Sequence, residues 1–238
     1  MYRPSAMDAP PAFLRLAGHP LRWRLLRELA HSDLRVGELC GLAGEQQSLV
    51  SYHLRQLRDG GLVRARRSSA DGRDSYYSLD LARCRDGLAD VGAALHPALA
   101  SHTRPRTARA RVLFVCTGNS ARSPMAAALC EQRSHGSVSA TSAGSHPKPL
   151  QAGAVRVLRT RGIDLAGRRP RHLDELAGER FDHVISLCDR VRERCPEARI
   201  HWSIPEPHED AAFEAVAAEL ETRIGFLIDA VNAGGIHA

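Results

Sequence analysis

A cysteine and an arginine stand six residues apart within Arg111–Pro124, which reads RVLFVCTGNSARSP. Cys116 is a nucleophile once its thiol is deprotonated, and Arg122 can bind two oxygens of a tetrahedral anion at once, which a lysine cannot. Ser123 can donate a hydrogen bond to the thiolate or to a leaving sulfur. These residue types at this spacing indicate attack by a thiolate on a bound oxyanion. The alternative is a buried structural cysteine followed by an ordinary loop.

The elements around this cysteine are expected to position it. Val112–Val115 is an apolar run typical of a buried parallel strand, and the Ala-rich stretch Ser123–Glu131 favours a helix. Loop amides and a helix N-terminus then converge on one point, and both favour an anion. The residues expected to bind the oxyanion are Thr117, Gly118, Asn119, Ser120, Ala121 and Arg122.

The stretch CTGNSARSP resembles the active-site loop of the low-molecular-weight protein tyrosine phosphatase fold, and more closely that of its thioredoxin-coupled arsenate reductases. The resemblance runs from Arg111 to the C-terminus. Strands predicted at 138–141, 183–187 and 199–202 alternate with helices at 152–161 and 209–230. This order predicts a parallel α/β sheet whose ligand crevice lies at the carboxyl ends of the strands.

Two further cysteines, Cys188 and Cys195, lie seven residues apart in VISLCDRVRERCP. The resembling arsenate reductases carry two cysteines at this place and spacing. The resemblance implies that Cys116 attacks arsenate, that Cys188 then attacks Cys116 as arsenite leaves, and that Cys195 moves the disulfide to Cys188–Cys195. Thioredoxin, or another thiol donor, would be the external reductant, and no bound cofactor is expected.

The same resemblance implies a general acid after Trp202, where the family commonly has an aspartate before proline. Here Glu206 stands in that place and could protonate the departing oxygen, the alternative being a surface glutamate between prolines. Some members hold potassium through a glutamate on the loop helix. That position is Ala127 here, so no potassium site is expected, and Cys130 is expected to be a packed helix residue.

Charge is distributed unevenly over the 238 residues. Residues 1–110 carry 17 arginines against 11 acidic residues, whereas residues 111–238 are neutral overall. This indicates a polyanionic partner such as nucleic acid for the first half, the alternative being a solvated basic surface. No apolar run of about 18 residues predicts a membrane span, and MYRPSAMDAP lacks the apolar core of a signal peptide, so a cytoplasmic location is expected.

The first half has the pattern of a helix-turn-helix followed by a wing. Helices are predicted on both sides of His19-Pro20, at 33–42 and at 48–59, with strands at 62–67 and 75–79 joined by a turn at 69–72. SLVSYHLRQLRDGGLVRARR and RDSYYSL resemble the winged-helix repressors of the ArsR family, over about residues 11–100. The residues that this implies for operator DNA are Gln47, Ser48, Ser51, Tyr52 and His53 in the major groove and Arg66, Arg67 and Arg73 on the wing.

Two alternatives stay open in this half. His53 could instead be a packed helix histidine. Family members that sense arsenite carry two or three cysteines before the recognition helix, but only Cys40 is present here; it is either an arsenite ligand, with or without Cys84, or a buried core cysteine. The family is dimeric, and the helices expected to form the homodimer are 11–17 and 81–99, the latter with a stripe of Leu88, Val91, Leu95 and Leu99.

We therefore predict a mainly α winged helix-turn-helix domain at 1–100, a linker at 101–110, and an α/β domain of the low-molecular-weight phosphatase type at 111–238. The predicted function is a DNA-binding repressor that also reduces arsenate. The alternatives are a DNA-tethered tyrosine phosphatase and a regulator whose second domain only senses oxyanions.

Overall fold

The computed structural model describes residues 9–70, 73–96, 99, 109–165, 167–192, 195 and 198–232. The chain forms two compact units, which are described separately. The first includes the described residues before 67, residues 75–96 and residue 99. The second includes the described residues of 67–74 and those from residue 109 onward. Within the described ranges, no helix is long and apolar enough to cross a membrane.

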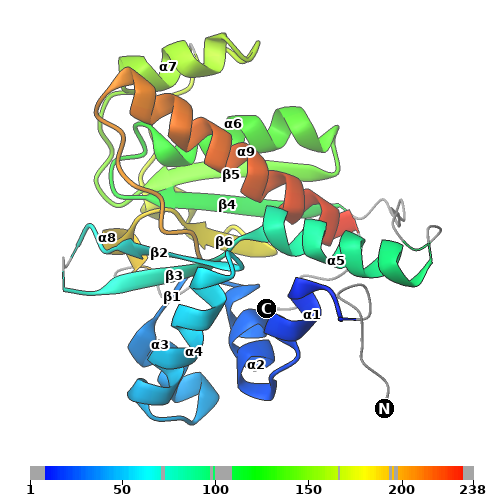
Figure 1. Ribbon diagram of the computed structural model, residues 1–238. Helices are drawn as coiled ribbons and strands as arrows, with labels where there is room; N and C mark the ends of the chain where they lie inside the picture. Colours follow the sequence, from blue (N-terminus) through cyan, green and yellow to red (C-terminus); the bar gives the residue numbers. More distant parts are fainter. Residues whose placement is uncertain are drawn as a thin grey trace, which may run out of the picture. The chain divides into compact units, whose positions relative to one another are not determined.

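The first unit is a winged helix-turn-helix, as predicted (Figure 1). Its helix break at His19-Pro20 is confirmed: the His19 ring accepts a hydrogen bond from the Leu21 N–H, and Pro20 takes the first helical position, where no N–H is needed. The elements are α1 (Ala12–Ala17), α2 (Pro20–Leu29), β1 (Leu34–Arg35), α3 (Val36–Ala43), α4 (Gln47–Asp59), β2 (Val63–Arg67), β3 (Ser75–Leu79) and α5 (Leu81–Leu95), with strand order β1-β3-β2.

Two boundaries in this unit differ from the predictions. The helix predicted from residue 33 begins at Val36, because Leu34 and Arg35 pair antiparallel with β3 as a strand too short to leave a pattern. The helix predicted to reach residue 99 ends at Leu95, where His96 takes an extended conformation. Residues 71–72 of the predicted turn lie outside the described residues.

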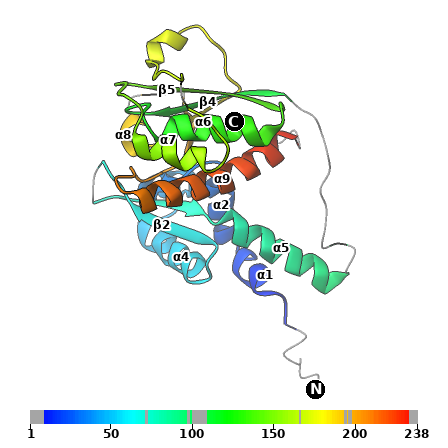
Figure 2. The same cartoon turned by 90° about the horizontal axis from the view of Figure 1, so that it is seen from above.

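The second unit is a parallel four-stranded sheet with helices, as predicted. Its strands are β4 (Ala110–Cys116), β5 (Val138–Gly144), β6 (His183–Ser186) and β7 (Ile200–His201), in the order β5-β4-β6-β7. Its helices are α6 (Arg122–Ser134), α7 (Ala152–Arg159), the short 3-10 helix η3 (Leu173–Leu176), α8 (Asp189–Arg192) and α9 (Asp210–Asn232). Figures 1 and 2 show α6, α7 and α9 on one side of β4 and β5.

Burial explains how this sheet is held. Val112 and Phe114 of β4 are fully buried, and α9 turns an apolar stripe inward, as its helical spacing predicted. The predicted linker lies mostly outside the described residues, and its last residue, Ala110, already belongs to β4. Since β4 and β6 run parallel, with Val115 opposite Ser186, Cys116 and Cys188 come to the same edge of the sheet.

Candidate functional site

The loop from Cys116 to Ser123, named here the oxyanion loop, joins β4 to α6. No described oxygen accepts a hydrogen bond from the backbone N–H groups of Thr117 to Ser123. Buried backbone donors are normally paired within the protein or with bound molecules. A run of such amides next to the first turn of a 13-residue helix can bind an anion.

The orientation of these amides is set by residues 145–151, named here the flanking segment. His146 and Lys148 donate backbone hydrogen bonds of 2.8 Å to the carbonyls of Thr117 and Gly118, and Gln151 donates one of 2.9 Å to the Ser120 carbonyl. Because C=O and N–H point to opposite sides of a planar peptide, the N–H groups that follow these carbonyls point away from the flanking segment. Sequence reasoning missed this segment, because bonds between main-chain atoms leave no side-chain signature.

A chain of polar contacts ends at the sulfur of Cys116, which is 2% exposed. The Arg171 N–H donates to Asn119 Oδ1 at 2.8 Å, and Asn119 Nδ2 donates to Ser123 Oγ at 2.9 Å. Ser123 Oγ lies 3.0 Å from Cys116 Sγ. The serine oxygen accepts from Asn119, and its proton can go to the sulfur or to the Ala143 carbonyl, 3.4 Å away, so Ser123 is placed to donate to a Cys116 thiolate.

The loop requires a glycine at the end of β5. A Cβ on Gly144 would lie 2.7 Å from the Thr117 carbonyl oxygen and 2.8 Å from the Asn119 nitrogen, both of them backbone atoms. Asn119 takes a left-handed conformation, with φ of 43°, which asparagine tolerates better than most residues. The loop is therefore shaped by a close backbone approach and by one unusual dihedral angle.

Arg122, the residue expected to bind the oxyanion, lies next to Glu206, the residue expected to act as general acid. Arg122 is 5% exposed and donates to the Ile204 carbonyl at 3.1 Å and to Glu206 Oε2 at 3.3 Å. The Glu206 side chain is 48% exposed, so it also reaches solvent. The structure thus brings Cys116, Ser123, Arg122 and Glu206 around one loop.

Cys188 is buried beside the oxyanion loop, with its sulfur 3.2 Å from Thr117 Oγ1. Cys195 is also buried, three residues beyond the end of α8, among the apolar residues of the second unit. All six cysteines are free thiols. The sequence-predicted thiols therefore share one core, with Cys188 in contact with the loop that carries Cys116.

The helix that follows Cys188 is anchored by a buried polar group that sequence reasoning missed. Asp189 Oδ1 accepts a hydrogen bond of 2.7 Å from Ser203 Oγ and lies 3.1 Å from His201 Nε2. Ser186 Oγ lies 2.9 Å from the other ring nitrogen of His201. These contacts join α8 to β6 and β7. The sequence carried one sign of this anchor, an acidic residue directly after a cysteine.

The candidate DNA-reading face lies on α4 of the first unit. Gln47, Ser48 and Tyr52 are exposed and Ser51 is half-buried, so the start of this helix presents polar side chains to solvent. On the wing strands and turn, Arg66 is half-buried, and Arg67 and Arg73 are exposed.

His53 is a correction. Its side chain is 5% exposed, its ring lies 4.3 Å from that of His19, and burial is the main cause that lowers its pKa. A side chain this buried is turned away from a base edge. The structure thus favours the alternative of a packed helix histidine, since Val50, Leu54 and Leu57 of the same helix are buried with it.

The two cysteines of the first unit are each partly buried against its core. Burial, reinforced by the charge of Asp80, raises the pKa of Cys84 to about 11, so this thiol stays protonated at neutral pH. Searched over its described residues, the chain holds no group of three metal-ligating side chains.

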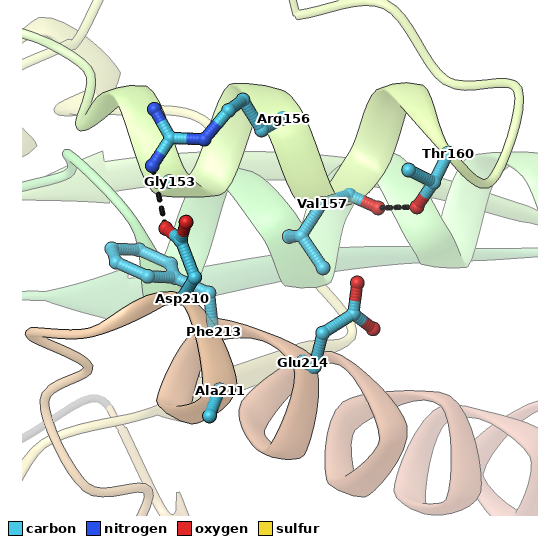
Figure 3. Close-up of a pocket in the computed structure, with 8 residues that line it drawn as sticks. All are labelled: Gly153, Arg156, Val157, Thr160, Asp210, Ala211, Phe213 and Glu214. Carbon is cyan, nitrogen blue, oxygen red and sulfur yellow. Dashed lines mark hydrogen bonds and ion pairs between the residues drawn. The ribbon is translucent and has the colours of Figure 1, made fainter.

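A surface pocket of about 320 Å³ lies between α7 and α9 (Figure 3). Arg156 and Asp210 form an ion pair of 2.5 Å at its rim, and Phe213 and Val157 form its apolar wall. None of the predicted site residues lines it. The chemistry predicted from the sequence belongs to the oxyanion loop and not to this pocket.

Comparison with known proteins gives two family matches. Residues 111–235 match the family described as low molecular weight phosphotyrosine protein phosphatase, and residues 19–65 match the bacterial regulatory proteins of the arsR family.

Individual relatives match the second unit. An arsenate reductase of Brevibacillus brevis is 30% identical over 120 residues, covering 48% of this chain and 90% of the relative. A protein-arginine-phosphatase of Geobacillus stearothermophilus is 39% identical over 99 residues, covering 37% of this chain and 64% of the relative. A solved arginine phosphatase from Geobacillus stearothermophilus aligns with a TM-score of 0.47 and 30% identity, over 52% of this chain and 94% of that one.

Proposed function

Because the chain belongs to the low molecular weight phosphotyrosine protein phosphatase family through residues 111–235 and carries an arsR-family regulatory domain at 19–65, we propose that it is a DNA-binding repressor that also reduces arsenate to arsenite. The arsenate reductases among its relatives support the choice of substrate. The observation that carries the proposal is the place of Cys188, which lies against the oxyanion loop at the edge of the sheet where Cys116 ends β4.

The first step is attack by the Cys116 thiolate on the arsenic of a bound arsenate. The loop amides and Arg122 neutralise the oxyanion, and Ser123 stabilises the thiolate until it attacks. One arsenate hydroxyl leaves as water. We assign its proton to Glu206, which accepts from Arg122 in the structure and would take up a proton from solvent once the bound oxyanion pairs with Arg122. The product is a Cys116–arsenate thioester in which arsenic is still pentavalent.

The second step transfers two electrons to arsenic. The Cys188 thiolate attacks Cys116 Sγ, the sulfur–arsenic bond breaks with its electron pair going to arsenic, and arsenite leaves as a Cys116–Cys188 disulfide forms. The Cys195 thiolate then attacks Cys188 Sγ, which releases the Cys116 thiolate. The resulting Cys188–Cys195 disulfide is reduced by the dithiol of thioredoxin or of another thiol donor.

This relay requires α8 to move, because the Cys188 sulfur must meet two partners in turn. Asp189, the first residue of α8, is held by Ser203 and His201 in the structure described here. Movement of Cys188 therefore requires that at least some of these buried contacts break. The short length of α8, Asp189–Arg192, favours such local unwinding.

The test is arsenate-dependent NADPH consumption by the full chain with thioredoxin and thioredoxin reductase. Wild type should turn over, Cys188→Ser should release no arsenite, Cys195→Ser should release at most one arsenite per chain, and Cys130→Ser should behave as wild type. Loss of turnover in Cys130→Ser, or continued turnover in Cys188→Ser, would contradict the relay.

A phosphatase is the second candidate, and the likeness to a protein-arginine-phosphatase favours testing it. Hydrolysis of phosphoarginine and of phosphotyrosine peptides by the same preparation separates the two functions. A phosphatase that needs no thiol relay should keep its full rate in Cys188→Ser and Cys195→Ser.

DNA binding is tested by selecting duplexes from a random pool with the full chain. We expect a two-fold symmetric site, because we propose a homodimer through α5 and α1. Leu88, Leu95 and Leu14 support that dimer, since their side chains are 55%, 75% and 43% exposed on these two helices. Leu95→Lys should give monomers by sedimentation and weaken binding to the selected duplex at least tenfold.

A further inference from the structure

The side chain of Lys148 lies along the oxyanion loop. Its backbone N–H donates to the Gly118 carbonyl at 2.8 Å, and its Cδ is 3.8 Å from the position that a Cβ on Gly118 would take. The aliphatic stem therefore runs over the one loop residue that has no side chain. Lys148 is exposed, and it is the only lysine of the chain, against 32 arginines.

The backbone around this lysine is stiff. Pro147 and Pro149 stand on both sides of it, and a residue that precedes proline is restricted to extended conformations. The bonds from His146, Lys148 and Gln151 fix the same stretch to the oxyanion loop. Little backbone entropy is therefore lost in keeping the ammonium group near the loop.

The positive charge of Arg122 is partly offset by a neighbouring carboxylate, whereas that of Lys148 is not, among the described residues. The charge of the Arg122 guanidinium is offset by Glu206, whose Oε2 lies 3.3 Å from Arg122 Nη2. Lys148 forms no ion pair with any residue in the described part of the chain. An exposed cation at the edge of an anion site raises the local concentration of anions, and this effect falls as salt screens it.

We propose that Lys148 is a substrate-binding residue that captures small, doubly charged oxyanions at the oxyanion loop. The inference rests on the proposed oxyanion chemistry of that loop and adds the residue that recruits its substrate. A lysine suits this task because its ammonium is a mobile point charge that follows an anion without fixing it, whereas Arg122 provides the bidentate grip.

The test uses binding, so that it does not depend on turnover. Cys116→Ser in the full chain removes the nucleophile, and titration calorimetry then measures the affinity for inorganic arsenate and inorganic phosphate. Adding Lys148→Gln should weaken both about fivefold at low ionic strength, as expected for a surface charge near a dianion, and the difference should shrink in about 0.5 M salt. Lys148→Arg should keep most of the affinity.

Arg133→Gln is the matched control, because it removes the same charge from an exposed residue in the last turn of α6, at the end away from the loop. It should leave both affinities unchanged. Equal affinities for Lys148→Gln and Arg133→Gln would overturn the proposal. If Lys148→Gln weakens anion binding but the wild-type chain does not reduce arsenate, the reductase proposal fails and the capture role of Lys148 stands.

Discussion

Cys116 and Cys130 lie at two places in one domain and are almost equally buried, at 2% and 0% exposed. Cys116 ends a strand, faces the hydroxyl of Ser123 and precedes a run of backbone amides without acceptors among the described residues. Cys130 lies inside α6 among apolar side chains, and burial, with a smaller effect of Glu131, raises its pKa to about 12. The two thiols are therefore alike in burial and differ in the polar groups around the sulfur, and the reactivity proposed for Cys116 depends on that difference.

The largest expected effect comes from removing each sulfur in turn. Cys116→Ser should lower arsenate turnover by at least about 1,000-fold, because no other group can form the covalent adduct. Cys130→Ser should keep turnover within about twofold of wild type. Steady-state NADPH consumption measures both, and a similar loss in the two variants would remove the distinction between them.

The serines near the two ends of α6 provide the second test. Ser123→Ala removes the hydrogen bond to the Cys116 sulfur and should lower turnover by about 10- to 100-fold, the range for a hydrogen bond to a charged group. Ser134→Ala is the control, since its hydroxyl serves only the Glu131 and Val138 carbonyls among the described residues.

A second measurement on these serine variants separates chemistry from misfolding. The rate of alkylation of Cys116 by iodoacetamide at neutral pH should fall in Ser123→Ala, because the sulfur has lost its contact with the serine hydroxyl. The rate should not change in Ser134→Ala. Equal rates in both variants would mean that Ser123 acts on the fold and not on the thiolate.

The third test concerns stability at high pH. The pKa of Cys130 rises from an ordinary value of 9.0 to about 12 in the folded chain, so its contribution to stability is present below pH 9 and is lost as the pH rises toward 12. Each pH unit in that window should cost about 1.4 kcal/mol for this one proton. Urea unfolding at pH 8 to 11 should show a shallower decline for Cys130→Ala than for wild type.

The smallest expected effect is that of Glu131, whose charge is the lesser cause of the raised pKa of Cys130. Glu131→Gln should lower the folded-state pKa of Cys130 slightly. The alkaline decline should still begin near pH 9, where the unfolded chain loses this proton, but it should end at a slightly lower pH, so the total loss of stability is a little smaller. Loss of the exposed pair of Glu131 with Arg168 should be nearly independent of pH in this window. A change larger than that of Cys130→Ala would mean that charge, and not burial, governs this thiol.

The parts of the site that could be predicted are those that lie together in sequence. Strand, cysteine, loop, arginine and helix follow one another within Arg111–Pro124, so their geometry follows from local chemistry. The flanking segment and the anchor at Asp189 could not be predicted, because they join residues distant in sequence through main-chain atoms and buried hydroxyls. For His53 the family resemblance implied a base contact and a packed helix histidine was the open alternative; its burial supports the alternative.

Most of the fold was predicted because its helices and strands have clear periods and glycine or proline boundaries. β1 was missed because a strand of two residues is too short to show alternating hydrophobicity. The end of α5 was misplaced because the apolar spacing continues past Leu95 although the helix does not. The start of α3 was decided by the pairing of β1 with β3, and the end of α5 by the extended backbone of His96.

The flanking segment holds the oxyanion loop through main-chain atoms at His146, Lys148 and Gln151. Side chains on that segment can therefore be exchanged while the hydrogen bonds that shape the loop persist. Mutagenesis libraries at 146 and 148 provide a route to re-targeting this catalytic unit toward other oxyanions, with its folding left largely untouched.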